Sequence, residues 1–279
     1  MLQLLEVCKS RASGRRHDRD MLRTTESVES ADGTRVVFHL QGDGPPLVVL
    51  HGALTTTDMY NGLTDMLASR YRVVVVERRD YGPSGSGPRP AGFSRQAADL
   101  GAVLGVLGEP AFVFGHSIGG LVALHAMHET SSAVRRLALY EPPVALAGPV
   151  LASALAEIQE LVKRDRPEEA IVEFFTAISD SARPPTTLEP IARILAHRAA
   201  GLVADLECLT AMEPDLSRWS TLDTQTLLLA GDNTDSYGSK SIDLLHATLP
   251  NADLMVLAGQ GHHPDDPAAV AAALSEFFG

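Results

Sequence analysis

Cysteine, basic residues and long apolar runs are all scarce in this chain, and each shortage excludes a class of protein. The two cysteines, Cys8 and Cys208, are too widely spaced for a zinc site and too few for a disulfide scaffold, which fits a reducing compartment. The chain has 23 Lys and Arg against 35 Asp and Glu, so its net charge is −12. A chain of this charge is not expected to have the basic surface that binds nucleic acids or anionic membranes. No stretch reaches the roughly 18 uninterrupted apolar residues of a transmembrane helix. We therefore expect a soluble cytoplasmic protein whose partner is a small molecule, not a nucleic acid or a membrane.

The first 22 residues also lack the order of a secretory signal. A short apolar stretch over residues 1–7 precedes a polar run rich in arginine, whereas a signal has its positive charge first. We expect a disordered leader over residues 1–22 without a function, and Met21 is an alternative start. Residues 23–279, with the ordinary apolar content of a globular protein, are long enough for one large domain.

Short, continuous apolar runs recur along this domain and alternate with helical segments. Continuous apolarity is typical of strands buried on both faces, so these runs predict a parallel central sheet and an α/β fold. The expected strands are residues 47–50, 73–76, 111–114, 137–140, 226–230 and 254–257, and the expected helices include 95–107 and 119–129. A β-rich run at 34–40 follows the turn Asp32-Gly33 and predicts a hairpin with residues 25–30.

The interval between residues 140 and 226 has helical periodicity and no convincing strand pattern. Leu151 and Ile158 share one helical face, and Phe174 and Ile178 share another. Prolines divide the interval into short helices. Because about 80 residues exceed the needs of a crossover connection, we expect a helical lid over about residues 142–220, which covers one end of the sheet.

The strongest chemical signal is the segment FVFGHSIGG at residues 112–120. An apolar strand leads into the pattern G-x-S-x-G, and a helical segment follows. The flanking glycines allow a tight turn that holds Ser117 exposed at the edge of the sheet. The N-terminus of the next helix favours developing negative charge there. This pattern predicts a nucleophilic serine, which needs a base within hydrogen-bond reach.

Further landmarks make the chain resemble the α/β-hydrolase-fold superfamily, and within it the small, lidded bacterial serine hydrolases. The landmarks are His51-Gly52 after an expected strand, the segment ERRDYGPSG at 77–85 and the segment GQGH at 259–262. The second one resembles the family's D-x-R-G-x-G-x-S loop, from which Glu77 and Asp80 depart. The resemblance implies a mostly parallel sheet flanked by helices and a triad in the order serine, acid, histidine.

His262 is the expected catalytic base, because histidine titrates near neutrality and this loop should project it towards Ser117. Its neighbour His263 is the rival for this role. The resemblance implies an oxyanion hole formed by the backbone N–H groups of Ala53 and Ile118. We expect no metal ion and no organic cofactor.

The acid of the triad has three candidates. The family usually carries it after the strand at 226–230, but there the expected position holds Thr234, with Asp232 too early and Asp235 one residue late. Glu141 follows the preceding core strand, where some family members have their acid, and two prolines restrict the chain directly after it. The sequence favours Glu141 and leaves Asp235 and Asp232 open.

A serine at position 117 excludes the chemistry of epoxide hydrolases and haloalkane dehalogenases, which use an aspartate there. We expect a serine hydrolase for a small to medium, largely apolar ester or related carbonyl compound. A carbon–carbon hydrolase, a biosynthetic cyclase or lyase, and a ligand-binding receptor with a weakly active triad are the alternatives. The oligomeric state stays open, although an apolar lid would suit a homodimer. The candidate pocket residues are Leu54, Leu151, Phe174, Phe175 and Trp219.

Overall fold

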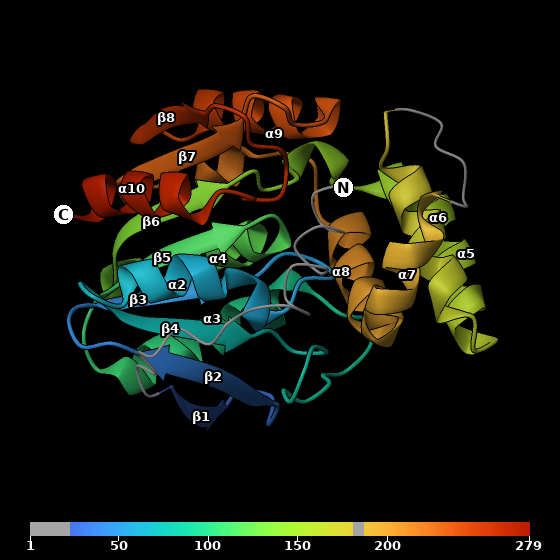
Figure 1. The fold of residues 1–279 in the computed structure, drawn as a ribbon, viewed down its shortest axis with the longest axis horizontal. Coiled ribbons are helices and arrows are strands. Elements are labelled where there is room, and N and C mark those ends of the chain that lie inside the picture. The colour runs from blue at the N-terminus through green and yellow to red at the C-terminus, as the bar shows by residue number, and fades with distance from the viewer. Residues whose placement is uncertain (1–22, 181–186) are drawn as a thin grey trace.

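A single β-sheet forms the centre of the molecule (Figure 1). The computed structural model describes residues 23–180 and 187–279, so the expected leader and Cys8 lie outside the described residues. Within this part of the chain the sheet has eight strands in the order β1-β2-β4-β3-β5-β6-β7-β8. The strands are β1 (Thr24–Glu29), β2 (Arg35–Gln41), β3 (Pro46–Leu50), β4 (Arg72–Glu77), β5 (Ala111–His116), β6 (Val134–Tyr140), β7 (Thr226–Gly231) and β8 (Ala252–Leu257).

The pairing of these strands confirms the expected α/β fold with a mostly parallel sheet. β1 and β2 form the expected antiparallel hairpin, β2 pairs antiparallel with β4, and all later pairs are parallel. The expectation that residues 254–257 are buried on both faces was wrong. Leu254 is 38% and Val256 57% exposed, because β8 is an edge strand with one neighbour.

Helices cover both faces of the sheet and divide its apolar residues into two cores. Val48 and Leu50 of β3 belong to the core shared with α3 and α4, whereas Leu47 and Val49 belong to the core shared with α2 and α10. This alternation follows from the period of two in a strand. The helices are α2 (Asn61–Leu67), α3 (Phe93–Leu107), α4 (Ile118–Thr130), α9 (Ser236–Thr248) and α10 (Pro267–Phe278).

The chain between β6 and β7 forms a separate group of helices beside the sheet, on the right in Figure 1. The regular elements described in this interval are all helical, as the sequence predicts. The longer ones are α5 (Ala152–Lys163), α6 (Pro167–Ala177), α7 (Glu189–Leu195) and α8 (Ala199–Ala211). None of the helices in the described ranges is long and apolar enough to cross a bilayer.

Close backbone contacts fix the turn between β5 and α4. A Cβ atom on Gly119 would lie 2.3 Å from the carbonyl oxygen of Leu50, and one on Gly115 would lie 2.6 Å from the Cα atom of Gly120. Backbone atoms cannot move aside as a flexible side chain can. Both glycines of the G-x-S-x-G pattern are therefore required by the packing of α4 against β3 and β5.

We expect Gly119→Ala to destabilise the fold by about 1–3 kcal/mol, since the added methyl group overpacks this contact. Gly105→Ala is the matched control, because Gly105 lies exposed in α3 with open space around it. That change should stabilise the helix by roughly 0.5–1 kcal/mol. Urea unfolding, followed by the fluorescence of the single tryptophan, measures both effects. A stable Gly119→Ala protein would contradict the packing argument.

Candidate active site

Three side chains from different strand ends form one hydrogen-bonded chain. Ser117 follows β5, Glu141 follows β6, and His262 lies in the loop after β8. The Oγ of Ser117 lies 3.0 Å from Nε2 of His262, and Nδ1 of His262 lies 2.8 Å from Oε2 of Glu141. An ionised carboxylate only accepts hydrogen bonds, so Nδ1 carries the proton and Nε2 presents its lone pair to the serine. The arrangement can therefore remove a proton from Ser117.

Strained backbone is concentrated where neighbouring strands end at this edge. A non-glycine residue with positive φ follows each of four adjacent strands, namely Leu54 (58°), Asp80 (67°), Ser117 (53°) and Glu141 (44°). Such conformations cost about 1–3 kcal/mol each and are kept at functional sites. Ser117, with ψ of −124°, is thereby turned out of the strand direction before α4 begins. This edge of the sheet is the candidate active site.

Glu141 is fully buried and receives three hydrogen bonds. The N–H of Gly231 donates to Oε1 at 2.8 Å, while the hydroxyl of Thr234 donates to Oε2 at 2.6 Å and joins His262 there. A carboxylate removed from water needs such partners. Thr234 thus occupies the family's usual acid position, in the loop after β7. There it contacts the carboxylate of Glu141, which follows the neighbouring strand β6. The sequence showed only that Thr234 cannot carry the charge.

The other two candidate acids have different surroundings. Asp232 accepts a hydrogen bond from the N–H of Gly259 at 2.7 Å, which ties two loops together. Asp235 is the N-cap residue of α9 and lines the cavity beside the serine. Of the three carboxylates, the structure brings Glu141 alone into hydrogen-bond contact with His262.

Two other histidines near Ser117 do not bond its hydroxyl. Nδ1 of His263 lies 3.3 Å from Oδ1 of Asp265 without forming a hydrogen bond, and the residue contacts the cavity, not the serine hydroxyl. His116 bonds the carbonyl of His262 at 2.9 Å through Nε2 and the hydroxyl of Tyr60 at 2.5 Å through Nδ1. Burial lowers the pKa of His116 well below its ordinary value, so the ring is neutral and supports the loop that carries His262.

The loop after β3 lies directly against the serine. A Cβ atom on Gly52 would lie 3.1 Å from that of Ser117. The N–H of Gly52 donates to the hydroxyl of Tyr60, and that of Leu54 donates to the hydroxyl of Tyr81, each at 3.2 Å. Neither tyrosine binds the N–H of Ala53, which lies between them. Ala53 and Ile118 both line the cavity beside Ser117. Tyr81 lies within the segment at 77–85 but at a position that the motif leaves variable, and Tyr60 lies outside the motifs, so neither role was expected from the sequence.

A cavity of about 250 Å³ opens beside the serine, and its walls are mostly apolar. Four of the five expected pocket residues line it: Leu54, Leu151, Phe174 and Phe175. Trp219 does not, and this expectation was wrong. It lies in the segment that returns from α8 to β7, where the indole is fully buried and packs edge-on against His125 of α4. Within the described ranges, no group of three or more potential metal ligands is found.

The comparisons with known proteins agree with this architecture. The family described as "Alpha/beta hydrolase family" matches residues 47–273. An alpha/beta hydrolase from Sphaerobacter thermophilus DSM 20745 is 29% identical, with a TM-score of 0.79 over 91% of this chain and 100% of that chain. A thermophilic esterase from Thermogutta terrifontis is 22% identical, with a TM-score of 0.76 over 91% of this chain and 98% of its own, and shares the fold. A Mycobacterium tuberculosis protein described as uncharacterized is 25% identical over 90% of this chain and 80% of its own length.

Proposed function

The chain belongs to the alpha/beta hydrolase family, and on this basis we propose that it is a serine hydrolase for small to medium, largely apolar carboxylic esters. The observation that carries the proposal is the unbroken hydrogen-bonded chain from Ser117 through His262 to Glu141, at the wall of an apolar cavity. Ester hydrolysis needs nothing beyond these groups and water. The helices α5–α8 act as the lid over this cavity.

The proposed reaction has two halves. His262 takes the proton of Ser117 as its oxygen attacks the ester carbonyl, and then donates that proton to the leaving alcohol. An acyl group is left on Ser117. In the second half His262 activates a water molecule, which releases the acid and restores the serine. Glu141 holds the ring in the required tautomer and stabilises its protonated form.

The negative oxygen of the tetrahedral intermediate needs two donors. We assign this role to the backbone N–H groups of Ala53 and Ile118, which come from the two loops that meet at Ser117. Each such donor is typically worth about 10²–10³ in rate. The N-terminus of α4 adds a favourable field at the same point.

The walls of the cavity support an apolar substrate of modest size. Apolar side chains from the lid face it, among them Leu151, Phe174 and Phe175, while Leu54 faces it from the core. Carboxylates on the wall, such as that of Asp235, disfavour an anionic acyl group. The likeness in fold to a protein described as an esterase, from Thermogutta terrifontis, supports the proposal.

Covalent labelling and an ester series test the proposal. A fluorophosphonate should add one equivalent to Ser117, located by mass spectrometry of the digested protein. p-Nitrophenyl esters from acetate to decanoate should be hydrolysed, with kcat/KM highest for short to medium acyl chains because the cavity is small. Labelling in Ser69→Ala, which removes an exposed hydroxyl, should equal that of the unchanged protein.

Failure of the reagent to label Ser117 in folded protein would disprove the covalent mechanism. Tight ligand binding with negligible turnover would instead favour a receptor. Labelling without hydrolysis of any ester, lactone or thioester would favour carbon–carbon cleavage or a cyclase or lyase reaction in the same site.

A further inference from the structure

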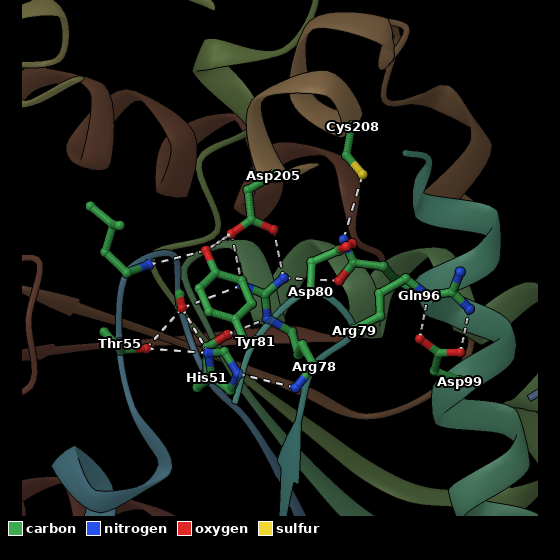
Figure 2. A network of polar contacts seen from close by, with 12 residues as sticks. His51, Thr55, Arg78, Arg79, Asp80, Tyr81, Gln96, Asp99, Asp205 and Cys208 are labelled. Atoms are coloured by element: carbon green, nitrogen blue, oxygen red, sulfur yellow. Dashed lines mark hydrogen bonds and ion pairs between the residues drawn. The ribbon is translucent and has the colours of Figure 1, made fainter. Parts of the chain in front are cut away.

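A buried carboxylate of the lid joins the lid to the core beneath it (Figure 2). Asp205 lies in α8, and its side chain is only 2% exposed although it contacts the cavity. Arg78, just after β4, donates to both of its oxygens at 2.7 and 2.8 Å, and the hydroxyl of Tyr81 donates to one of them at 2.7 Å. The charge of Arg78 therefore balances that of the carboxylate, and both carboxylate oxygens accept hydrogen bonds from groups of the core.

Arg78 connects this pair to the loop that starts with His51. Its Nε donates to the carbonyl of His51 at 2.9 Å, and a terminal nitrogen lies 3.3 Å from the carbonyl oxygen of Gly52. Its backbone N–H donates to Nε2 of His51 at 3.1 Å. Two consecutive peptide units of the loop are thus held by one guanidinium group. A planar, always charged group with several donors is suited to such a role.

Tyr81 connects Asp205 to the other end of the same loop. Its hydroxyl donates to Asp205 and accepts the N–H of Leu54, whose φ is 58°. Burial, and next the Asp205 carboxylate, raise the pKa of Tyr81 well above its ordinary value, so the hydroxyl keeps the proton that it donates. α8 packs directly against this ring at Gly201, where an added Cβ atom would lie only 2.5 Å from the ring.

We propose that Asp205, acting through Tyr81 and Arg78, is a positioning residue that sets the backbone of residues 51–54 and thereby aims the N–H of Ala53 at the oxyanion. The inference rests on the proposed function of Ala53. The lid then contributes to the chemical step itself and does more than enclose the substrate. The hydrogen bonds of Arg78 and Tyr81 hold the backbone on both sides of Ala53. Their loss would therefore allow the backbone N–H of Ala53 to move.

This role has a kinetic signature that simple loss of stability does not have. An oxyanion donor acts on the tetrahedral intermediate and hardly on the flat ester, so its displacement lowers kcat and leaves KM nearly unchanged. A displacement of about 1 Å can cost on the order of 100-fold. Binding of a trifluoromethyl ketone, which forms an oxyanion with the serine, should weaken by the same factor.

The decisive variant is Tyr81→Phe, which removes one hydroxyl and keeps the ring beneath α8. We expect kcat for a p-nitrophenyl ester to fall about 10–100-fold, KM to change less than about threefold, and the ketone inhibition constant to rise with the fall in kcat. Tyr71→Phe is the matched control, since its hydroxyl bonds the carbonyl of Gly279 at 3.4 Å, and its kinetics should be unchanged.

Asp205→Asn should lower kcat at least as much as Tyr81→Phe. Its control is Glu207→Gln, a carboxylate of the same helix that accepts from Arg89 and from the N–H of Ala91 instead. If Asp205→Asn does not fold, Tyr81→Phe decides alone. Unchanged kcat and ketone affinity in Tyr81→Phe, with the unchanged protein active, overturn this inference only. Absence of both turnover and a Ser117 adduct in the unchanged protein overturns the proposed function and this inference together.

Discussion

Ser117→Ala is expected to abolish ester turnover while the fold and its stability are retained. The change removes one hydroxyl from a buried backbone turn, and with it the oxygen that is hydrogen-bonded to His262 and that attacks the ester carbonyl in the proposed reaction. Loss of a complete serine–histidine unit typically costs about 10⁶ in kcat. His262→Ala should cost nearly as much, because an unassisted hydroxyl is a weak nucleophile at neutral pH. Steady-state kinetics and thermal unfolding of each variant measure both parts of the prediction.

The double variant tests whether the two residues act as one unit. Since either loss disables the same proton transfer, Ser117→Ala with His262→Ala should be little worse than Ser117→Ala alone. His263→Ala is the control, because His263 lies next to His262 in the same loop and is not bonded to the serine hydroxyl. If the two losses multiplied as independent effects, or if His263→Ala were as damaging as His262→Ala, the proposed chain of proton transfer would be wrong.

Glu141→Gln is expected to lower kcat by up to roughly 10⁴ with little change of the fold. The amide has nearly the shape of the carboxylate, but it cannot balance the charge of a protonated His262 and can turn its NH₂ group towards Nδ1. The ring then adopts the tautomer that points a hydrogen, not a lone pair, at Ser117. The N–H of Gly231 donates to Oε1 of Glu141, so the side chain is also held at the oxygen that does not contact His262.

Asp235→Asn and Asp232→Asn are the matched controls for this acid. Both replace a carboxylate by an amide in the loop after β7, and neither carboxylate is bonded to His262. We expect kcat within about threefold of the unchanged protein for Asp232→Asn, since an exposed carboxylate that bonds one N–H has a small effect. Asp235 lines the cavity, so its change should act mainly on KM. A larger loss of kcat in Asp235→Asn than in Glu141→Gln would identify Asp235, after β7, as the acid of the triad.

Local patterns in the sequence were enough for most of the sheet. Strands buried on both faces need continuous apolar runs, and all six expected core strands are found in the structure. The exception concerns burial at β8, because a run of residues 254–257 looks the same whether or not another strand lies beyond it. The sequence also selected Ser117 and His262, since each lies in a glycine-containing motif after a strand, and the structure places Oγ of Ser117 3.0 Å from Nε2 of His262.

Only the tertiary structure decided which groups from distant parts of the chain meet. Glu141, Asp232 and Asp235 all follow core strands, and the contact of one carboxylate with His262 depends on how the loops after β6, β7 and β8 are packed. The burial of Trp219 against α4 depended likewise on the path of the chain from α8 to β7. The pairing of Arg78 with Asp205 spans 127 residues and has no local signal. Spacing and periodicity describe neighbours along the chain, whereas these contacts depend on the relative placement of whole elements, which packing determines.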